Sequence, residues 1–281
     1  MSVATVVCSR NRPDRLTQLL GLLSNQTLPP DFIIVVDSSD DNLGLVLADR
    51  NLHFIHSLPG LPFQRQIGLE RAAALGANTV VFLDDDVSIP PDFLERIMVP
   101  VLANPRDLIG TNDSEMDAGW KFLPLLRRAN WISKGALAHL GRTPPRLEEV
   151  GWVPGFCMAG HVEVFLSVGF PTEIRMLTED IAFQMCFKSH GRILLQPNLG
   201  LQHFPDSRGR LGAIHSTLKW NYMRRRLVAK YPEVFSMRHL YLEVMLLFVV
   251  DIIRIRPSAI GHLRFLLRSI CRCEPVYDFR T

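Results

Sequence analysis

The chain opens with short apolar runs, rich in β-branched residues, that alternate with a segment of helical spacing. Residues 3–7 form a short run rich in β-branched residues, and residues 32–36 form a continuous apolar run. Both are typical of buried strands. Between them, leucines recur at the spacing of one helix face over residues 14–23. The pattern therefore predicts a β-α-β opening.

A further unit repeats this order. A short strand at 54–55 leads into a turn at 58–62, a helix at 65–75 and an apolar strand at 80–83. Strands that alternate with helices predict an α/β fold, with a mostly parallel sheet flanked by helices. In such folds ligands bind in the crevice beyond the carboxyl ends of the strands.

Polar side chains gather where these strands end. Arg10 follows the first strand, Asp37 the second, and Asp84-Asp85-Asp86 the last. Three adjacent carboxylates repel one another, and a hard divalent cation relieves that repulsion most directly. The acidic run alone indicates either a metal site or a solvated acidic turn.

The composition favours a globular protein of a reducing compartment. The chain has 281 residues and 47% hydrophobic content, which is ample for a core. Its five cysteines are scattered, so neither a disulfide framework nor a zinc module is indicated. The first eight residues carry no positive segment ahead of their apolar stretch, which argues against a signal peptide. We therefore expect a cytoplasmic location.

The formal net charge of +3 hides an asymmetry along the chain. Residues 214–281 contain 12 Lys/Arg against 5 Asp/Glu, whereas residues 1–213 contain 19 against 23. We therefore predict a domain at 1–213 and a basic helical extension at 214–281 that attracts an anionic partner. No nucleic-acid reading helix is recognisable there, so a membrane surface is favoured over nucleic acid.

Two amphipathic helices are expected in this extension. Residues 239–255 are strongly apolar but are interrupted by Glu243, Asp251 and Arg254, and the longest apolar run is too short to cross a bilayer. After Pro257, arginines fall on one face of a second helix, at positions 264, 268 and 272. Such faces suit the headgroup region of anionic lipid, which we favour; the alternative is that the helices pack on the rest of the protein or on a partner subunit.

Several segments, in order, resemble the family 2 glycosyltransferases of the GT-A fold, which use nucleotide-diphospho-sugar donors. The matching segments are residues 3–13, 32–39, 64–68, 82–86, 155–160 and Thr178-Glu179-Asp180. They include an Asp-x-Asp signature at 84–86 and a Glu-Asp motif at 179–180. The chain departs from the family where Ser38 follows Asp37 and where Gln66 replaces the usual asparagine.

The resemblance assigns roles to particular residues. It implies that Ser9, Arg10, Asp37, Arg65, Asp84 and Asp85 contact the nucleotide donor. It places a Mn²⁺ or Mg²⁺ ion on Asp86, with His203 as a further ligand, and it makes Asp180 the catalytic base. The irregular residues 110–150, which include Trp120 and Trp131, are then expected to bind the acceptor.

The chemistry of sugar transfer asks for the same groups. A leaving nucleoside diphosphate needs a divalent cation to neutralise its developing charge. The incoming hydroxyl needs one general base, which we assign to Asp180, and direct displacement inverts the anomeric centre. We therefore predict an inverting glycosyltransferase with a UDP or dTDP sugar donor and a saccharide or lipid-linked saccharide acceptor. Surface polysaccharide or glycolipid assembly, at the inner face of the membrane, is the expected setting, and Arg224-Arg225-Arg226 could meet phosphates of such an acceptor.

Two other functions remain open from the sequence. A sugar nucleotidyltransferase shares the parallel sheet, but we would expect a glycine-rich phosphate loop after the first strand, where Ser9 to Arg12 contain no glycine. A non-catalytic scaffold with the same fold would not need Arg65, Asp86 or Asp180.

Overall fold

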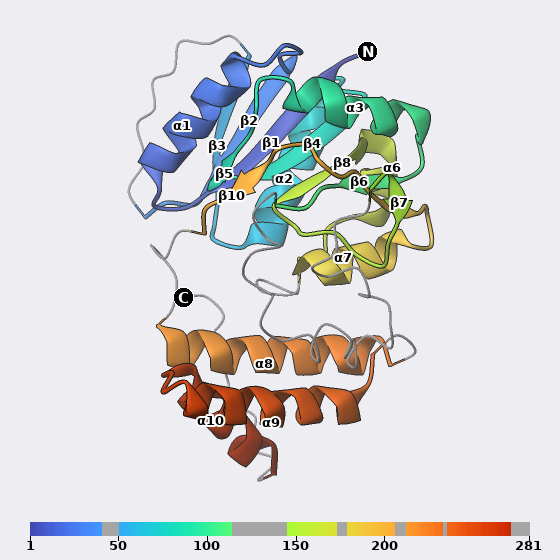
Figure 1. Cartoon of the computed structure of the whole chain (residues 1–281). Helices are drawn as coiled ribbons and strands as arrows, with labels where there is room; N and C mark the ends of the chain where they lie inside the picture. Colours follow the sequence, from blue (N-terminus) through green and yellow to red (C-terminus); the bar gives the residue numbers. More distant parts are fainter. Residues whose placement is uncertain (41–50, 114–144, 173–178, 206–211, 233–234, 271–281) are drawn as a thin grey trace. The chain divides into compact units, whose positions relative to one another are not determined.

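The computed structural model describes residues 1–40, 51–113, 145–172, 179–205, 212–232 and 235–270 (Figure 1). These residues divide into two compact units, the first ending at residue 205 and the second beginning at residue 212. Trp120, Trp131, Thr178 and Arg272, which the sequence analysis singled out, lie outside the described residues.

An eight-stranded sheet forms the centre of the first unit, in the order β3-β2-β1-β4-β8-β6-β9-β7. Its strands are β1 (Val3–Ser9), β2 (Phe32–Asp37), β3 (Leu52–His56), β4 (Thr79–Asp84), β6 (Leu108–Gly110), β7 (Glu148–Glu149), β8 (Cys157–His161) and β9 (Ile193–Leu195). The four strands β3, β2, β1 and β4 are parallel, whereas β8 runs antiparallel to both β4 and β6. The predicted α/β class is confirmed, and its second half is mixed rather than parallel.

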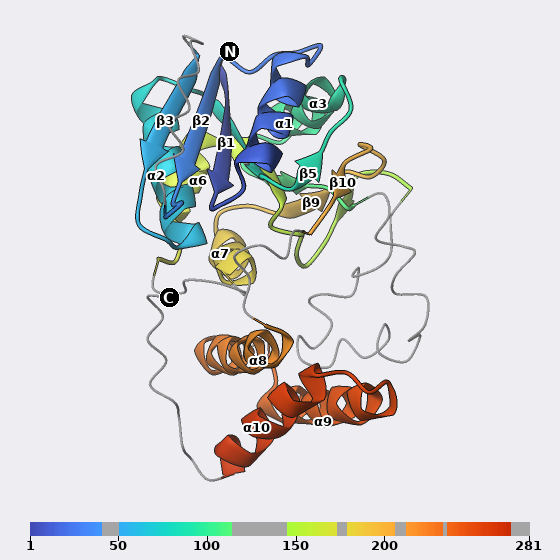
Figure 2. The same cartoon turned by 90° about the vertical axis from the view of Figure 1, so that its left-hand side faces the viewer.

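Helices cover both faces of this sheet (Figures 1 and 2). On one face, α1 (Pro13–Ser24) and α3 (Phe93–Ala103) pack on alternate strand residues such as Val7, Val35 and Leu83. The intervening strand residues face α2 (Leu61–Ala74), α6 (Val162–Val168) and α7 (Glu179–Phe187). Because both strand faces are buried, β1, β2 and β4 are apolar almost without interruption.

The structure corrects one predicted helix boundary. Helix α2 begins at Leu61, whereas the sequence analysis placed a turn at 58–62 and started the helix at Arg65. Pro62 lies in the first turn of α2, where its missing N–H is not needed. Residues 162–168 form the short helix α6, which directly follows β8.

A second, two-stranded sheet lies beyond the end of β4. Strands β5 (Val87–Ser88) and β10 (Gln202–His203) pair antiparallel, with His203 opposite Val87. This pairing joins segments that are more than one hundred residues apart in the sequence.

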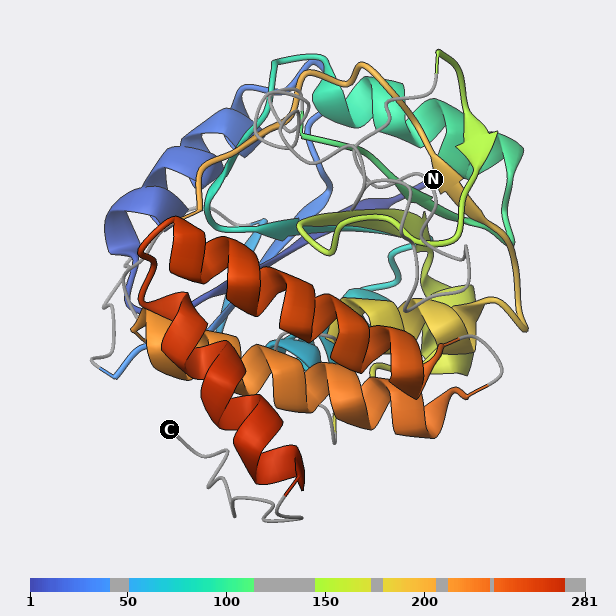
Figure 3. The same ribbon diagram turned by 60° about the horizontal axis from the view of Figure 1, so that its bottom comes forward.

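Among the described residues, the second unit contains α8 (Ala213–Lys230), α9 (Met237–Ile253) and α10 (Ser258–Ile270). Helices α8 and α9 run side by side and α10 lies across them (Figures 1 and 3). Tyr222 meets the ring of Phe265 edge-on at 5.1 Å, and Leu240 and Val244 of α9 are fully buried. Within the residues described, no helix combines the length and the apolar character that crossing a membrane requires.

Candidate functional site

The carboxyl ends of β1, β2 and β4 meet at one edge of the large sheet. Ser9 is in register with Asp37, and Cys8 with Asp84. Parallel strands all end in the same direction, so residues distant in sequence converge at this edge. The structure thus brings together the ends of three strands that carry predicted site residues.

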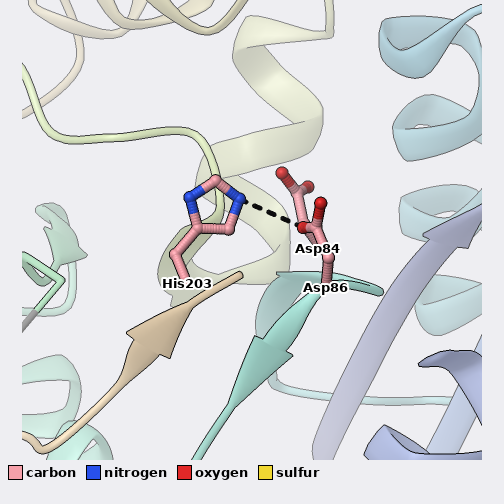
Figure 4. A group of neighbouring side chains, drawn as sticks. All are labelled: Asp84, Asp86 and His203. Atoms are coloured by element: carbon pink, nitrogen blue, oxygen red, sulfur yellow. Dashed lines mark hydrogen bonds and ion pairs between the residues drawn. The ribbon is translucent and has the colours of Figure 1, made fainter. Parts of the chain in front are cut away.

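Asp84, Asp86 and His203 form a group of three potential metal ligands (Figure 4). One ligand atom from each lies within 4.8 Å of the others, and His203 Nε2 is 3.1 Å from Asp86 Oδ1. The β5–β10 pairing holds His203 in place, and the Phe156 ring stacks on its imidazole at 4.9 Å. Two carboxylates and an imidazole are a donor set that fits a divalent cation.

Burial and neighbouring charges shift the pKa values of this group. Burial disfavours the protonated imidazole of His203, but the hydrogen bond and charge of Asp86 outweigh it and raise the pKa. Burial raises the pKa of Asp84, and the Arg65 guanidinium partly opposes that rise. The carboxylate of Asp84 therefore depends on nearby positive charge to stay ionised.

Asp85 points to a different set of partners from its two neighbours. Its Oδ1 accepts a 2.7 Å hydrogen bond from Arg12 Nη1, and its Oδ2 accepts a 2.8 Å bond from the Ser9 hydroxyl. Arg12 Nη1 also lies 3.1 Å from Asp86 Oδ2. Burial nevertheless raises the pKa of Asp85 to about 6. Asp85 thus ties the loop after β1 to the end of β4.

Arg65 is almost fully buried and links Asp84 at the end of β4 to the segment at Gly155. Its Nη2 donates to Asp84 Oδ1 at 3.0 Å and to the backbone oxygen of Gly155 at 2.7 Å. Its Nη1 has no hydrogen-bond partner among the described residues. Burial opposes the charge of Arg65 most strongly, but Asp84, Glu179 and Asp180 together raise its pKa. Arg65 therefore stays cationic between the two groups of carboxylates.

Glu179 and Asp180 begin α7 and form the second group of carboxylates. Burial raises the pKa of Asp180, and burial together with Asp180 raises the pKa of Glu179 to about 7. Asp180 Oδ1 accepts from the backbone N–H of Ile181 at 2.8 Å. A Cβ on Gly155 would lie 2.7 Å from Asp180 Cβ, so only glycine lets this segment approach so closely. Both carboxylates therefore hold a proton more readily than an exposed carboxylate does, which suits proton uptake by a general base.

The remaining predicted residues lie in the loops beside this cluster. Asp37 is fully buried, and its carboxylate accepts from the hydroxyl and the backbone N–H of Ser39, at 2.8 and 3.2 Å. Arg10 pairs with Asp40 at 3.2 Å rather than with the acidic run. Asp37 and Arg10 therefore belong to the surroundings of the site, not to the group around Asp84.

Sequence reasoning missed three residues that shape the site. Arg12 bridges Asp85 and Asp86, Phe156 stacks on His203, and the buried amide of Gln64 donates to the backbone oxygens of Ser9 and Val36. Arg12 lies in the same loop as Arg10, just before a predicted helix, so its position after the first strand could have indicated a role in the site. For Gln64 and Phe156 the partners are known only from the fold.

Comparisons with known proteins agree with this arrangement. The family model described as Glycosyl transferase family 2 matches residues 4–166, from β1 into α6. No curated protein matches the chain.

Two solved structures share its fold. The crystal structure of S. aureus TarS is 17% identical, with a TM-score of 0.52, over 81% of this chain and 44% of its own. The crystal structure of GalNAc-T7 with UDP, GalNAc and Mn²⁺ is 14% identical, with a TM-score of 0.59, over 98% of this chain and 55% of its own. The chain thus spans about half the length of each, and the likeness shows a common GT-A fold. Because the family match covers more than half of the chain and includes the strands that carry the acidic run, the chain belongs to glycosyl transferase family 2.

Proposed function

We propose that the chain is a metal-dependent inverting glycosyltransferase that moves a sugar from a nucleoside diphosphate to an acceptor hydroxyl. One observation carries the proposal: buried Arg65 lies between a group of potential metal ligands and a pair of carboxylates with raised pKa values. The first group suits the diphosphate, and the second suits the incoming acceptor.

The proposed metal ligands are Asp84, Asp86 and His203, with Mn²⁺ or Mg²⁺ as the ion. When bound, a divalent cation neutralises the charge that develops on the leaving diphosphate. An imidazole in the ligand set favours Mn²⁺, because Mg²⁺ is usually held by oxygen ligands alone. The GalNAc-T7 structure, which has the same fold, contains UDP and Mn²⁺.

Asp180 is the proposed general base. It removes the proton of the acceptor hydroxyl as that oxygen attacks the anomeric carbon, and the diphosphate leaves from the opposite face. One base and one displacement give inversion, by analogy with inverting glycosidases. The raised pKa of Asp180 increases its affinity for this proton.

Other site residues hold the donor. Arg65 keeps Asp84 ionised and directs positive charge toward the diphosphate. Asp37, Ser9 and Arg10 are assigned to the nucleoside of a UDP or dTDP sugar. Asp85 acts mainly by holding the loop after β1, through Ser9 and Arg12.

The proposed acceptor is a saccharide or a lipid-linked saccharide in surface polysaccharide or glycolipid assembly. The setting is the inner face of the cell membrane, where the protein associates peripherally from the cytoplasm. The excess of Lys and Arg in residues 214–281 supports this setting.

A screen of nucleotide sugars with Mn²⁺ or Mg²⁺, with and without a lipid extract, tests the reaction. We expect metal-dependent release of nucleoside diphosphate with one donor, and loss of that release in Asp86→Ala and Asp180→Asn. A nucleotidyltransferase would release pyrophosphate from a nucleoside triphosphate instead. A scaffold would bind donor without turnover, and either result would overturn the proposal.

A further inference from the structure

Helix α9 turns its apolar side outward. Its most exposed large apolar side chains are spaced three, four, three and one residues apart, which places them on one face: Leu242, Met245, Val249, Ile252 and Ile253. Met245 is 55% exposed and Ile253 is 74% exposed. An exposed apolar face of this length on a soluble surface marks an interaction site.

The acidic residues of α9 point the other way. Glu243 Oε1 lies 2.5 Å from Arg224 Nη2 of α8, and Asp251 Oδ2 is 2.5 Å from the Ser258 hydroxyl and 3.5 Å from His262 Nε2. A helix that pairs its carboxylates with neighbouring helices and exposes its aliphatic residues reverses the usual pattern of a surface helix. Glu243 and Asp251 were predicted to interrupt the apolar character of this helix, whereas both contact other residues of the same unit.

Helix α10 adds a basic edge to an apolar face. Ile260, Leu263 and Leu267 are exposed at a spacing of three and four residues, and the neighbouring Arg264 and Arg268 are also exposed. All five arginines within the described residues 235–270 are exposed. The two acidic residues of that range, Glu243 and Asp251, are not. The outer faces of α9 and α10 therefore combine aliphatic side chains with positive charge alone.

We propose that the exposed faces of α9 and α10 bind the surface of an anionic lipid bilayer. The aliphatic side chains enter the boundary between headgroups and acyl chains, and Arg264 and Arg268 contact lipid phosphates. The inference rests on the peripheral membrane contact included in the proposed function, but not on sugar transfer itself. It assigns that contact to one face and to one lipid chemistry.

Charge favours lipid over a second copy of the chain as the occupant of this face. A symmetric dimer through the same face would bring the arginines of both copies close together without exposed acidic partners among the described residues of these helices. A bilayer that contains anionic headgroups instead supplies counter-charge at the edge and apolar surface at the centre.

Co-sedimentation of the full chain with vesicles tests the proposal, using phosphatidylcholine alone or with about one third phosphatidylserine as a test composition. We expect binding to the mixed vesicles only, weakened by salt. Arg264→Ser with Arg268→Ser should weaken it roughly 25-fold, since each arginine near an anionic surface contributes roughly fivefold. Met245→Gln with Ile253→Gln should weaken binding at least about tenfold through lost burial of apolar groups.

Matched controls are exposed residues of the first unit. Val99→Gln, at an apolar position of α3 that is 66% exposed, and Arg106→Ser should leave vesicle binding unchanged. Circular dichroism confirms that each variant is folded. The proposal would be overturned if the wild-type protein did not bind anionic vesicles. It would also be overturned if the chain formed a dimer that Met245→Gln with Ile253→Gln dissociated while vesicle binding stayed unchanged. Because no nucleotide sugar is present, failure here is distinct from failure of the transferase assay.

Discussion

The molecule buries ionisable side chains in two places, and the charge balance differs between them. At the edge of the large sheet the carboxylates outnumber the guanidiniums: Asp84, Asp85, Asp86, Glu179 and Asp180 stand with Arg12 and Arg65. In the helical unit, Glu243 has Arg224, and Asp251 has Ser258, His262 and Arg256. The first cluster carries an excess of negative charge, and the second is matched partner by partner.

This difference in charge balance distinguishes a cluster that can bind a ligand from one that only stabilises the fold. Buried charges without partners cost stability, so an excess is retained only where another group completes it. Glu179 Oε2 has no hydrogen-bond partner among the described residues, and the pKa of Glu179 is raised to about 7. In the helical unit the shifted groups are basic instead, because burial lowers the pKa of both His262 and Lys219. The excess at the sheet edge is what a divalent cation would balance.

The largest expected effect is on turnover. Asp180→Asn keeps the size of the side chain but cannot take up a proton, so kcat should fall by about 10²- to 10⁴-fold. Single-turnover assays with the donor found in the nucleotide-sugar screen measure the change. Donor and Mn²⁺ binding, followed by calorimetry, should stay within about twofold, because Asp180 is assigned to the acceptor side.

The matched control is Asp251→Asn, which changes a buried carboxylate of the helical unit to the same amide. Soluble-acceptor turnover should be nearly unaffected in this variant. A comparable loss of turnover in both variants would remove the distinction between the two clusters.

The second effect is on the stability of the helical unit. Arg224→Met removes the partner of Glu243 and keeps most of the side-chain volume, so the unit should lose about 3 kcal/mol. Hydrogen exchange followed by mass spectrometry reports each unit separately, and amides of α8 and α9 should exchange faster while those of β1 and β4 do not. An unchanged exchange rate would show that this pair is not structural. Arg264→Ser, an exposed arginine of the same unit, serves as the control.

The third effect is stabilisation by metal of the first unit alone. Mn²⁺ at one hundred times its dissociation constant should raise the free energy of unfolding by about 2.7 kcal/mol. Thermal unfolding with and without Mn²⁺ measures the gain, and Asp86→Ala should abolish it. Glu243→Gln, in the balanced cluster, should keep the full gain. Stabilisation that survives Asp86→Ala would place the ion elsewhere.

The parallel half of the sheet could be predicted from the sequence because the strands of that half are buried on both faces. Residues 32–36 and 80–83 are apolar without interruption, and residues 3–7 are apolar apart from Thr5. Such short runs between predicted helices are typical of strands buried on both faces. Strand β8, with the sequence Cys-Met-Ala-Gly-His, has no β-branched residue and no alternation, so its antiparallel position beside β4 was not predictable.

The candidate site was predictable in its carboxylates but not in their partners. Asp84–Asp86 and Glu179-Asp180 stand out as charge next to apolar runs. The contacts that distinguish them arise only from the fold: Arg12 meets Asp85 across 73 positions, and His203 meets Asp86 across 117. No local pattern carries such long-range pairing, so the distinct role of Asp85 came from the structure.

The smallest expected effect concerns pH, and it tests whether the excess charge at the sheet edge is costly in the absence of ligand. The folded pKa of Glu179 is raised from its ordinary 4.5 to about 7 by burial and by Asp180. Its contribution to stability is therefore present below pH 4.5 and is lost as the pH rises through 7. The glutamine of Glu179→Gln does not titrate. The free energy of unfolding of this variant should therefore rise relative to that of wild type between pH 5 and pH 8, by on the order of 2 kcal/mol. Hydrogen exchange of α7 at several pH values measures that difference. If the stability difference between Glu179→Gln and wild type did not change with pH, the sheet edge would tolerate its carboxylates without a counter-charge. The contrast with the helical unit would then no longer identify a cation site.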